Sequence, residues 1–260
     1  MIVDVGGDMS ESVGSEVSTP LRVMVTGGTG TLGEAVVLAF AKAGHRTYFQ
    51  YCRNERNANR LTEALGAEGF KIDFSRDFTL PESDFDVLVN CAGINISREQ
   101  AHSVDATSWD RMLRVNVTVP FLLSQAVLPG MLRRGWGRII NVGSIYSLRG
   151  AVNRAPYVAS KHALSGLTKV MALEYATTGV TCNEICPSAI DSDMIMRIAE
   201  NTARARGVTV DDILDEYRAM NPVGRMATAG EVASAVLYLA SPEAGFINGT
   251  SIPVDGGQIV

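Results

Sequence analysis

The sequence predicts an α/β fold in which helices cover both faces of a parallel sheet. Three observations predict it: short apolar runs alternate with helical patterns, a glycine-rich turn follows the first run, and 260 residues suit one large unit of this kind. Strands that are apolar throughout are typical of a parallel sheet buried on both sides. We therefore expect a single, doubly wound, Rossmann-type domain.

The expected strands are short runs rich in branched and aromatic residues. They are residues 21–26, 46–51, 70–74, 85–90, 138–142, 180–186 and 251–254. The expected helices show apolar residues at helical spacing, and the first ends at Gly44, a typical C-cap. They are residues 34–43, 55–65, 108–133, 156–176 and 229–240.

Residues 188–221 break this alternation with two amphipathic helical patterns, at about 193–206 and 210–220. Pro187 and Pro222 bracket the segment. A segment that leaves the carboxyl end of a strand lies beside the crevice in which open α/β sheets bind ligands. We expect residues 188–221 to form a lid over a substrate site.

Charge is unevenly distributed along the chain. The net charge is −5, and residues 1–20 contain four acidic residues and no lysine or arginine. We interpret residues 1–20 as a flexible acidic arm and residues 21–260 as the Rossmann-type domain. The nearly neutral body has no basic surface for a nucleic-acid backbone, so we expect no nucleic-acid partner.

Four cysteines (Cys52, Cys91, Cys182 and Cys186) are too few and too scattered for a disulfide framework. Cys182 and Cys186 lack a second pair of ligands, so we interpret them as buried apolar residues and expect no metal site. No run reaches the ~18 apolar residues of a membrane span. The N-terminus has neither the basic nor the apolar region of a secretory signal. We expect a cytoplasmic protein without a membrane partner.

The glycine-rich turn begins after Thr26, between the first expected strand and the first helix. Glycines there let backbone N–H groups approach a pyrophosphate at the helix N-terminus. A strand before and a helix after are the context that a dinucleotide-binding turn requires. The residues expected to bind the cofactor here are Gly27, Thr29, Gly30, Thr31, Leu32 and Gly33.

The end of the second strand distinguishes the two nicotinamide cofactors. An acid there binds the ribose 2′-OH of NAD, whereas an arginine accommodates the 2′-phosphate of NADP. No acid occurs before Glu55, and Arg53 and Asn54 stand at that position, with Arg46 as a weaker candidate. This pattern favours NADP(H) over NAD(H); the alternative is that Arg53 is a solvated loop charge.

Four polar residues form a candidate catalytic set. Tyr157 and Lys161 lie four residues apart on one expected helix and so share a face. An ammonium beside a phenol favours the ionised phenol. Ser144 follows a strand at the edge that faces the ligand crevice, where a hydroxyl polarises a carbonyl oxygen. Asn116 is a polar residue in an apolar helix, or alternatively a buried asparagine bonded to backbone.

These four residues and the glycine turn together resemble the short-chain dehydrogenase/reductase family, in its shorter single-domain branch, over residues 21–260. The resemblance implies that Tyr157 is the general acid/base and that Lys161 assists it and holds the nicotinamide ribose. It implies that Ser144 orients the carbonyl and that Asn116 holds a water in a proton relay.

Other family motifs fall in register. Asn90-Cys-Ala-Gly93 matches the family's Asn-Asn-Ala-Gly motif, and Val254-Asp-Gly-Gly257 matches its C-terminal signature. The resemblance adds cofactor residues on the adenosine side, at Asp73, Asn90, Ala92 and Gly93. It adds others on the nicotinamide side, at Pro187, Ile190 and Ser192.

The sequence departs from the family pattern at two glycines. Thr31 occupies the middle glycine position of the Gly-x-x-x-Gly-x-Gly motif, and Ser188 replaces a glycine after Pro187. The spacing of Gly27, Gly30 and Gly33 instead fits the Gly-x-x-Gly-x-x-Gly motif of the family's longer branch. Either Gly30 allows the close approach to the pyrophosphate, or Thr31 weakens cofactor binding.

The pattern is most similar to β-ketoacyl-carrier-protein reductases and related ketoreductases. This implies NADPH-dependent reduction of a small or carrier-bound carbonyl substrate, although the two carrier-docking positions, Gly135 and Thr178, are not basic. The expected substrate pocket includes residues near 94–96, 145–147, Arg149, Arg154 and 189–198.

Two other functions stay open. The lid pattern also resembles 3-hydroxybutyrate dehydrogenases, so one alternative is an NAD-dependent dehydrogenase of a small hydroxy acid or alcohol. The other is a non-catalytic dinucleotide-binding sensor or scaffold. The resemblance further implies a homo-oligomer, typically a tetramer.

Overall fold

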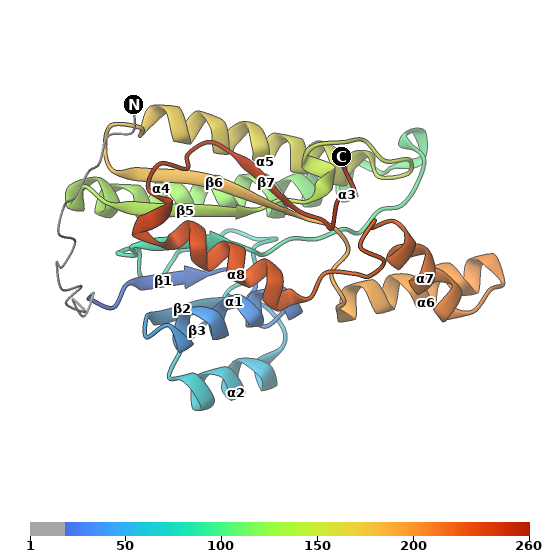
Figure 1. Cartoon of the computed structure of the whole chain (residues 1–260), viewed down its shortest axis with the longest axis horizontal. Helices are drawn as coiled ribbons and strands as arrows, with labels where there is room; N and C mark the ends of the chain where they lie inside the picture. The colour runs from blue at the N-terminus through green and yellow to red at the C-terminus, as the bar shows by residue number, and fades with distance from the viewer. Residues whose placement is uncertain (1–18) are drawn as a thin grey trace, which may run out of the picture.

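The computed structural model describes residues 19–260, and these form one seven-stranded parallel sheet in the order β3-β2-β1-β4-β5-β6-β7 (Figure 1). The expected acidic arm therefore lies almost entirely outside the described residues. The strands are β1 (Arg22–Val25), β2 (Arg46–Tyr51), β3 (Glu68–Lys71), β4 (Val87–Asn90), β5 (Gly137–Val142), β6 (Val180–Pro187) and β7 (Ser251–Val254).

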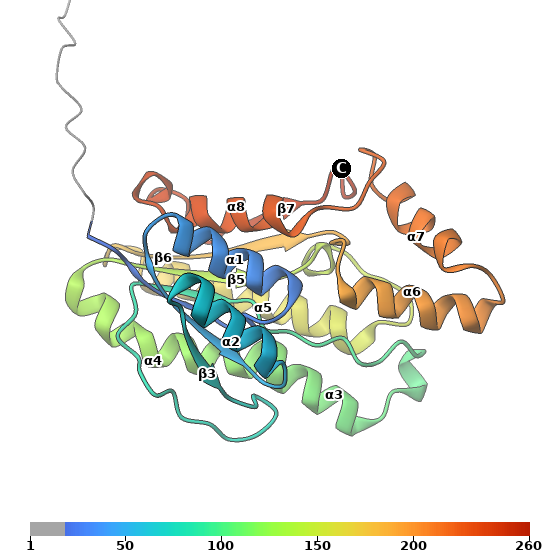
Figure 2. The ribbon, with the colours of Figure 1, turned by 90° about the horizontal axis from the view of Figure 1, so that it is seen from below.

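Helices cover both faces of this sheet (Figure 2). One face carries α1 (Thr31–Lys42), α2 (Glu55–Leu65) and α8 (Ala229–Ala240). The other face carries α3 (Ala106–Leu113), α4 (Val119–Arg134) and α5 (Ala155–Glu174). The doubly wound, Rossmann-type fold is confirmed.

Two apolar cores explain why the strands are apolar throughout. Successive strand residues point to opposite faces of a sheet. In β1, Val23 and Val25 are buried with Phe49 in the core under α1 and α8. Met24, between them, is buried with Leu123 in the core under α4. Both faces of β1 are therefore buried, which explains why its successive residues are apolar.

Two expected elements differ most from the structure. The third strand was expected at 70–74, but β3 begins at Glu68 and pairs with β2 in the register Tyr48↔Glu68. This edge strand is largely exposed, so its first residues carry no apolar signal. The first helix was expected from 34, but it begins at Thr31 because its first turn contains residues of the glycine motif.

The expected helix at 108–133 is a composite. A π-helical turn, Arg114–Thr118, joins α3 to α4 without a break. By length and composition alone the whole stretch Ala106–Arg134 could cross a membrane. However, 56% of its most apolar stretch is buried inside the protein, and α4 packs on β5. It is the core helix of this face of the sheet.

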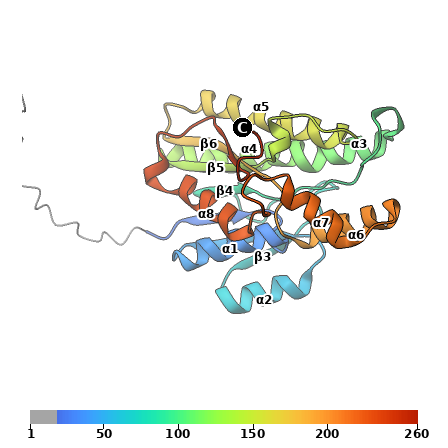
Figure 3. The same ribbon diagram turned by 45° about the vertical axis from the view of Figure 1, so that its right-hand side comes forward.

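The segment after β6 forms two helices, α6 (Asp193–Arg206) and α7 (Val210–Ala219), which extend beyond one end of the sheet (Figure 3). The turn between them contains Gly207, with φ of +68°, and a capping box made by Thr209 and Asp212. Arg206 pairs with both carboxylate oxygens of Glu216, each at 2.7 Å. The helical pair is as expected; its action as a lid stays a prediction.

All four cysteines are free, as expected. Burial raises the pKa of Cys182 and of Cys186 to about 12. Both thiols are therefore neutral at ordinary pH and pack as small apolar groups. Within residues 19–260 no group of three histidine, cysteine or acidic residues could hold a metal ion.

Candidate active site

The glycine turn connects β1 to α1 at the carboxyl edge of the sheet. Gly27 has φ of +67°, which a residue with a side chain rarely adopts. A Cβ atom on Gly33 would lie 2.1 Å from the Gly27 carbonyl oxygen, so the helix packs against the turn only with glycine there. Gly30 is the N-cap of α1 and offers no side chain to the first-turn N–H groups. Those groups are free for an anion, so the turn suits a dinucleotide pyrophosphate.

Thr31 is compatible with this geometry. It is the first residue of α1 and is half-buried, and the helix starts normally with it. Gly30 has ordinary space around a built Cβ, whose nearest atom is 3.4 Å away. A Cβ on Gly28 would lie 2.5 Å from Phe49 Cβ. Gly27, Gly28 and Gly33 are therefore the glycines on which the shape of the turn depends.

Two polar residues that the sequence analysis missed hold the turn in place. The N–H of Gly27 donates to Gln50 Oε1 at 2.9 Å, and Gln50 Nε2 donates to the Ile72 carbonyl at 2.6 Å. Thr26 Oγ1 accepts the N–H groups of Cys91 and Ala92, each at 2.9 Å. The sequence signal for this role was Gln50 itself, a polar residue in an otherwise apolar strand.

A cleft of about 860 Å³ opens between the glycine turn and α2. Thr29 and Thr31 line one side, and Asn54, Arg56 and Asn57 line the other. Asn54 caps α2 by accepting the Asn57 N–H, and Asn57 Nδ2 donates to the Thr29 carbonyl at 3.1 Å. The cleft lies where the cofactor was expected.

Three arginines lie near this cleft. Arg60 pairs with Glu34 at 2.5 Å. Arg53 is exposed after β2, and Arg56 lines the cleft; neither forms an ion pair with any residue in 19–260. Arg56 was missed because its place on the first turn of α2 is decided by how that helix packs.

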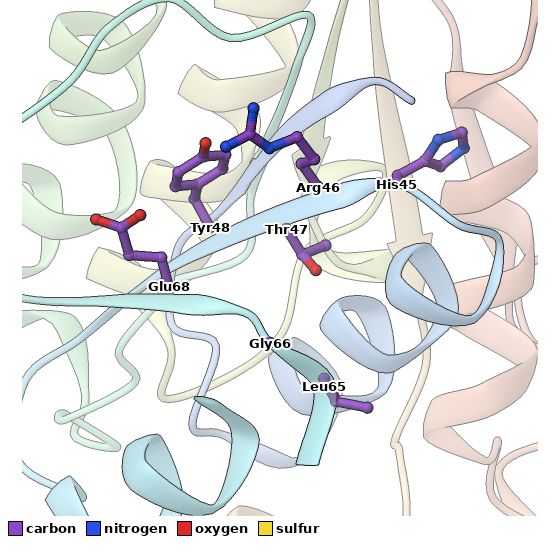
Figure 4. Close-up of a pocket in the computed structure, with 7 residues that line it drawn as sticks. All are labelled: His45, Arg46, Thr47, Tyr48, Leu65, Gly66 and Glu68. Carbon is purple, nitrogen blue, oxygen red and sulfur yellow. The ribbon is translucent and has the colours of Figure 1, made fainter. Parts of the chain in front are cut away.

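Arg46 lies at the opposite end of β2, which removes it as a phosphate ligand. It lines a separate cavity of about 250 Å³ with Thr47, Tyr48 and Glu68. In Figure 4, Arg46 and Tyr48 lie on one side of β2 and Thr47 points to the other. Six strand residues separate the two ends by roughly 17–20 Å.

Asp73 follows β3 and does not line the cleft. Its Oδ1 accepts the Ser75 hydroxyl at 2.7 Å and the Ser75 N–H at 3.0 Å. These two hydrogen bonds lower the pKa of Asp73. The carboxylate is thus oriented by its own turn, and its contact with an adenine ring stays a prediction.

Lys161 and Tyr157 lie together on α5, as expected. Lys161 is only 4% exposed, and its Nζ donates to the Val142 carbonyl at 2.8 Å. The same Nζ lies 5.7 Å from the centre of the Tyr157 ring. A buried ammonium is thereby held between the end of β5 and the phenol.

Asn116 lies in the π-helical turn and is buried. Its side chain accepts the Ile94 N–H at 2.9 Å and donates to the Ile94 carbonyl at 3.0 Å. Its Nδ2 also lies 3.0 Å from Ser160 Oγ. The Asn116 side chain is therefore bonded to the backbone of Ile94, as in the alternative given above. Single π-helical turns often occur at functional sites. A Cβ built on Gly93 would lie 3.6 Å from Asn116 Oδ1 and 3.7 Å from Lys161 Nζ, so the three residues converge.

Ser144 follows β5 and is 6% exposed. Its N–H donates to Ser147 Oγ at 3.2 Å, which closes the short turn that carries it. The ring of Tyr146, in that turn, lies edge-on to Tyr157 with centres 6.2 Å apart. The short turn that begins at Ser144 therefore packs against Tyr157 through Tyr146.

The remaining expected residues have structural contacts of their own. Asn90 Nδ2 donates to Asn141 Oδ1 at 2.8 Å inside the core, while its Oδ1 has no partner among the described residues. Pro187 ends β6, and Ile190 forms a bridge with Ala227. Ser192 caps α6 by accepting the Ile195 N–H. Their contacts with a cofactor stay predictions.

A family model described as enoyl-(acyl carrier protein) reductase matches residues 28–258. The chain belongs to the short-chain dehydrogenase/reductase family. It is therefore an oxidoreductase that acts on a carbonyl and its alcohol, and the non-catalytic scaffold is not supported.

Two relatives and one solved structure illustrate the match. D-beta-hydroxybutyrate dehydrogenase of Rhizobium meliloti (strain 1021) is 32% identical, over 90% of this chain and 96% of the relative. Acetoacetyl-CoA reductase of the same strain is 34% identical, over 90% of this chain and 97% of the relative. An actinorhodin polyketide ketoreductase variant solved with NADPH is 31% identical, with a TM-score of 0.85 over 92% and 97% of the two chains.

Gly33→Ala tests the packing of the turn. We expect the free energy of unfolding to fall by about 1–3 kcal/mol, because the new Cβ overlaps the Gly27 carbonyl. Gly30→Ala is the matched control and should cost about 0.5 kcal/mol or less. Urea unfolding measures both; equal losses would contradict the assignment of Gly33 as the constrained glycine.

Proposed function

We propose that the protein reduces a ketone to a secondary alcohol with NADPH, on a β-ketoacyl or specialised-metabolite substrate. The observation that carries the proposal is the buried Lys161 ammonium held between the Val142 carbonyl and Tyr157, next to the turn of Ser144. The catalytic set therefore gathers at the carboxyl edge of the sheet, where open α/β folds bind ligands.

The glycine turn would hold the pyrophosphate of a nicotinamide cofactor, and Lys161 its nicotinamide ribose. Bound there, the cofactor supplies the hydride that reduces the carbonyl carbon. The fit rests on the free first-turn N–H groups of α1 and on the close packing at Gly33.

Tyr157 and Ser144 act on the carbonyl oxygen. The Ser144 hydroxyl donates a hydrogen bond to that oxygen and stabilises the negative charge that develops on it. The Tyr157 hydroxyl gives its proton to the same oxygen and completes the alcohol. Lys161 stabilises the resulting phenolate, and Asn116 orients a water through which Tyr157 regains a proton.

The preference for NADPH is proposed from Arg53 and Arg56. Both are cations near the cleft without an acidic partner in residues 19–260, and an arginine binds a phosphate with paired N–H groups. A putative 2-deoxy-D-gluconate 3-dehydrogenase of Agrobacterium tumefaciens, 29% identical with a TM-score of 0.79, was solved with bound NADP.

A second candidate is a dehydrogenase of a small hydroxy acid, and Arg154 favours it. Its guanidinium lies 5.3 Å from the centre of the Tyr146 ring, which itself packs against Tyr157. No ion pair of Arg154 occurs within residues 19–260, so this cation could bind a substrate carboxylate near the reacting carbon. The D-beta-hydroxybutyrate dehydrogenase relative agrees with this candidate.

A small substrate is better supported than a carrier-bound one. The two positions expected to dock a carrier protein are not basic: they are Gly135, which is the C-cap of α4, and Thr178. The nearby Arg134 is neutralised by ion pairs with Asp84 and Asp86. We infer no nucleic-acid or membrane partner, and the cytoplasmic location stays a prediction.

A tetramer is proposed from apolar residues exposed on the outer helices. Phe121 on α4 and Val170 and Leu173 on α5 are exposed, Leu173 by 79%. Large apolar side chains left exposed on outer helices commonly mark contacts between subunits.

Light scattering tests the tetramer. We expect a mass four times the 27.8 kDa of the chain. Leu173→Asp should lower that mass, because it places a charge in the interface. Val152→Asp, at an 88% exposed loop residue, should leave it unchanged. A monomeric wild-type protein would reject the tetramer.

Tyr157→Phe tests the reaction. Removing the hydroxyl should lower kcat by about 10²–10⁴-fold, because the proton donor is lost. The Kd for NADPH, followed by cofactor fluorescence, should be unchanged since the ring and Lys161 remain. The assay follows nicotinamide absorbance with a β-ketoacyl thioester, a simple ketone and acetoacetate, and with a 2-enoyl thioester for comparison. Unchanged turnover would contradict the proposed role of Tyr157. A preference for acetoacetate would favour the second candidate function, a dehydrogenase of a small hydroxy acid.

Arg53→Ala tests the cofactor preference. We expect the Kd for NADPH to rise about tenfold and the Kd for NADH to change less than about twofold, because only NADPH carries the 2′-phosphate. Arg46→Ala, at the far end of β2, is the matched control. Tighter binding of NADH than of NADPH by the wild-type protein would reject this interpretation.

A further inference from the structure

A buried carboxylate lies directly behind the turn of Ser144. Glu184, in β6, is 0% exposed. Its Oε1 accepts the Ser147 hydroxyl at 2.7 Å, and its Oε2 accepts the Ser251 hydroxyl at 2.6 Å. No lysine, arginine or histidine of residues 19–260 pairs with it. Burying a carboxylate without a cation costs free energy of folding, so the placement of Glu184 calls for another explanation.

The end of β5 is shaped around this carboxylate. A Cβ atom on Gly143 would lie only 2.0 Å from Glu184 Oε1. Gly143 immediately precedes Ser144, and its N–H donates to the Ile185 carbonyl in β6 at 2.8 Å. The carboxylate therefore fills the space that a side chain would need at the residue before the catalytic serine.

Ser147 links the carboxylate to Ser144. The Ser147 oxygen accepts the Ser144 N–H at 3.2 Å, and the Ser147 N–H donates to the Ser144 carbonyl at 2.8 Å. The single hydroxyl hydrogen of Ser147 points to Glu184. With the hydrogen directed to the carboxylate, the oxygen presents its lone pairs to the Ser144 N–H. By accepting the Ser147 hydroxyl, Glu184 thus orients the Ser147 oxygen that accepts the Ser144 N–H.

We propose that Glu184 and Ser147 are positioning residues for carbonyl reduction. Together they hold the turn of residues 144–147 so that the Ser144 hydroxyl faces the reacting carbonyl oxygen. The proposal rests on the function proposed above, in which Ser144 donates to that oxygen. Displacements of about 1 Å at such a donor are enough to lower a rate by about 10²-fold.

The other oxygen of Glu184 provides a control within the same site. Ser251 belongs to β7, and its hydroxyl also contacts Ser165 Oγ, on α5, at 3.0 Å. This branch leads away from the 144–147 turn. Ser147→Ala and Ser251→Ala therefore each remove one hydroxyl from the same carboxylate, but only Ser147→Ala removes the hydrogen bond that the Ser144 N–H donates.

A double-mutant cycle tests the proposal by comparing Ser147→Ala in the wild-type protein and in Ser144→Ala. In the wild-type protein we expect kcat to fall about 10- to 100-fold, with the KM and the Kd for NADPH changed less than about twofold. In the Ser144→Ala protein, assayed at higher enzyme concentration, the same change should alter kcat less than about twofold, because Ser147 acts through Ser144.

The controls separate positioning from stability. Ser251→Ala should lower the Tm about as much as Ser147→Ala does, while kcat changes less than about twofold. Equal losses of kcat in these two variants, or an equal effect of Ser147→Ala in both backgrounds, would overturn the proposal. Ser144→Ala with unchanged kcat would instead overturn the role of Ser144 itself, and with it the mechanism proposed above. If Ser147→Ala does not fold, Glu184→Gln serves in the same cycle, and its effect must also disappear in the Ser144→Ala protein.

Discussion

The hydrogen bond from Lys161 to the Val142 carbonyl is the contact on which the site depends. It joins α5 to the last residue of β5, and Ser144 follows two residues later. A buried ammonium loses its hydration and needs such a partner. The bond therefore fixes the distance between the helix that carries Tyr157 and the turn that carries Ser144. The other active-site contacts are arranged around this junction.

A ladder of polar residues aligns the elements behind the junction. Asn90 donates to Asn141, which donates to Thr168 at 2.9 Å, so β4, β5 and α5 are tied together inside an apolar core. Glu184 with its serines ties β6 and β7 to the same region. Buried polar networks of this kind specify one arrangement because any slip leaves polar groups unpaired.

Much of the site was predictable because its signals are local. The spacing of Tyr157 and Lys161 on one helix, and the glycines between a strand and a helix, follow from chain geometry alone. Gln50, Arg56 and Glu184 were missed, and Ser147 was expected only as part of the substrate pocket. The roles of Gln50 and Glu184 depend on partners 22 to 67 residues away in the sequence, and the role of Arg56 depends on helix packing. β3 was misplaced because an exposed edge strand carries little apolar pattern.

The sequence by itself determined the fold class, the order of the strands and helices, and the identity of the four candidate catalytic residues. The fold class and the order of the elements along the chain follow from apolar periodicity. Tyr157 and Lys161 follow from their spacing on one helix, which is set by the backbone. Ser144 and Asn116 joined them through the resemblance to the family. Only the tertiary structure decided which glycines are sterically required, that Arg46 lies far from the cleft, and that Glu184 stands behind Ser144. Those facts depend on how strands distant in sequence are brought into register, and that register is set by the packing of the whole sheet.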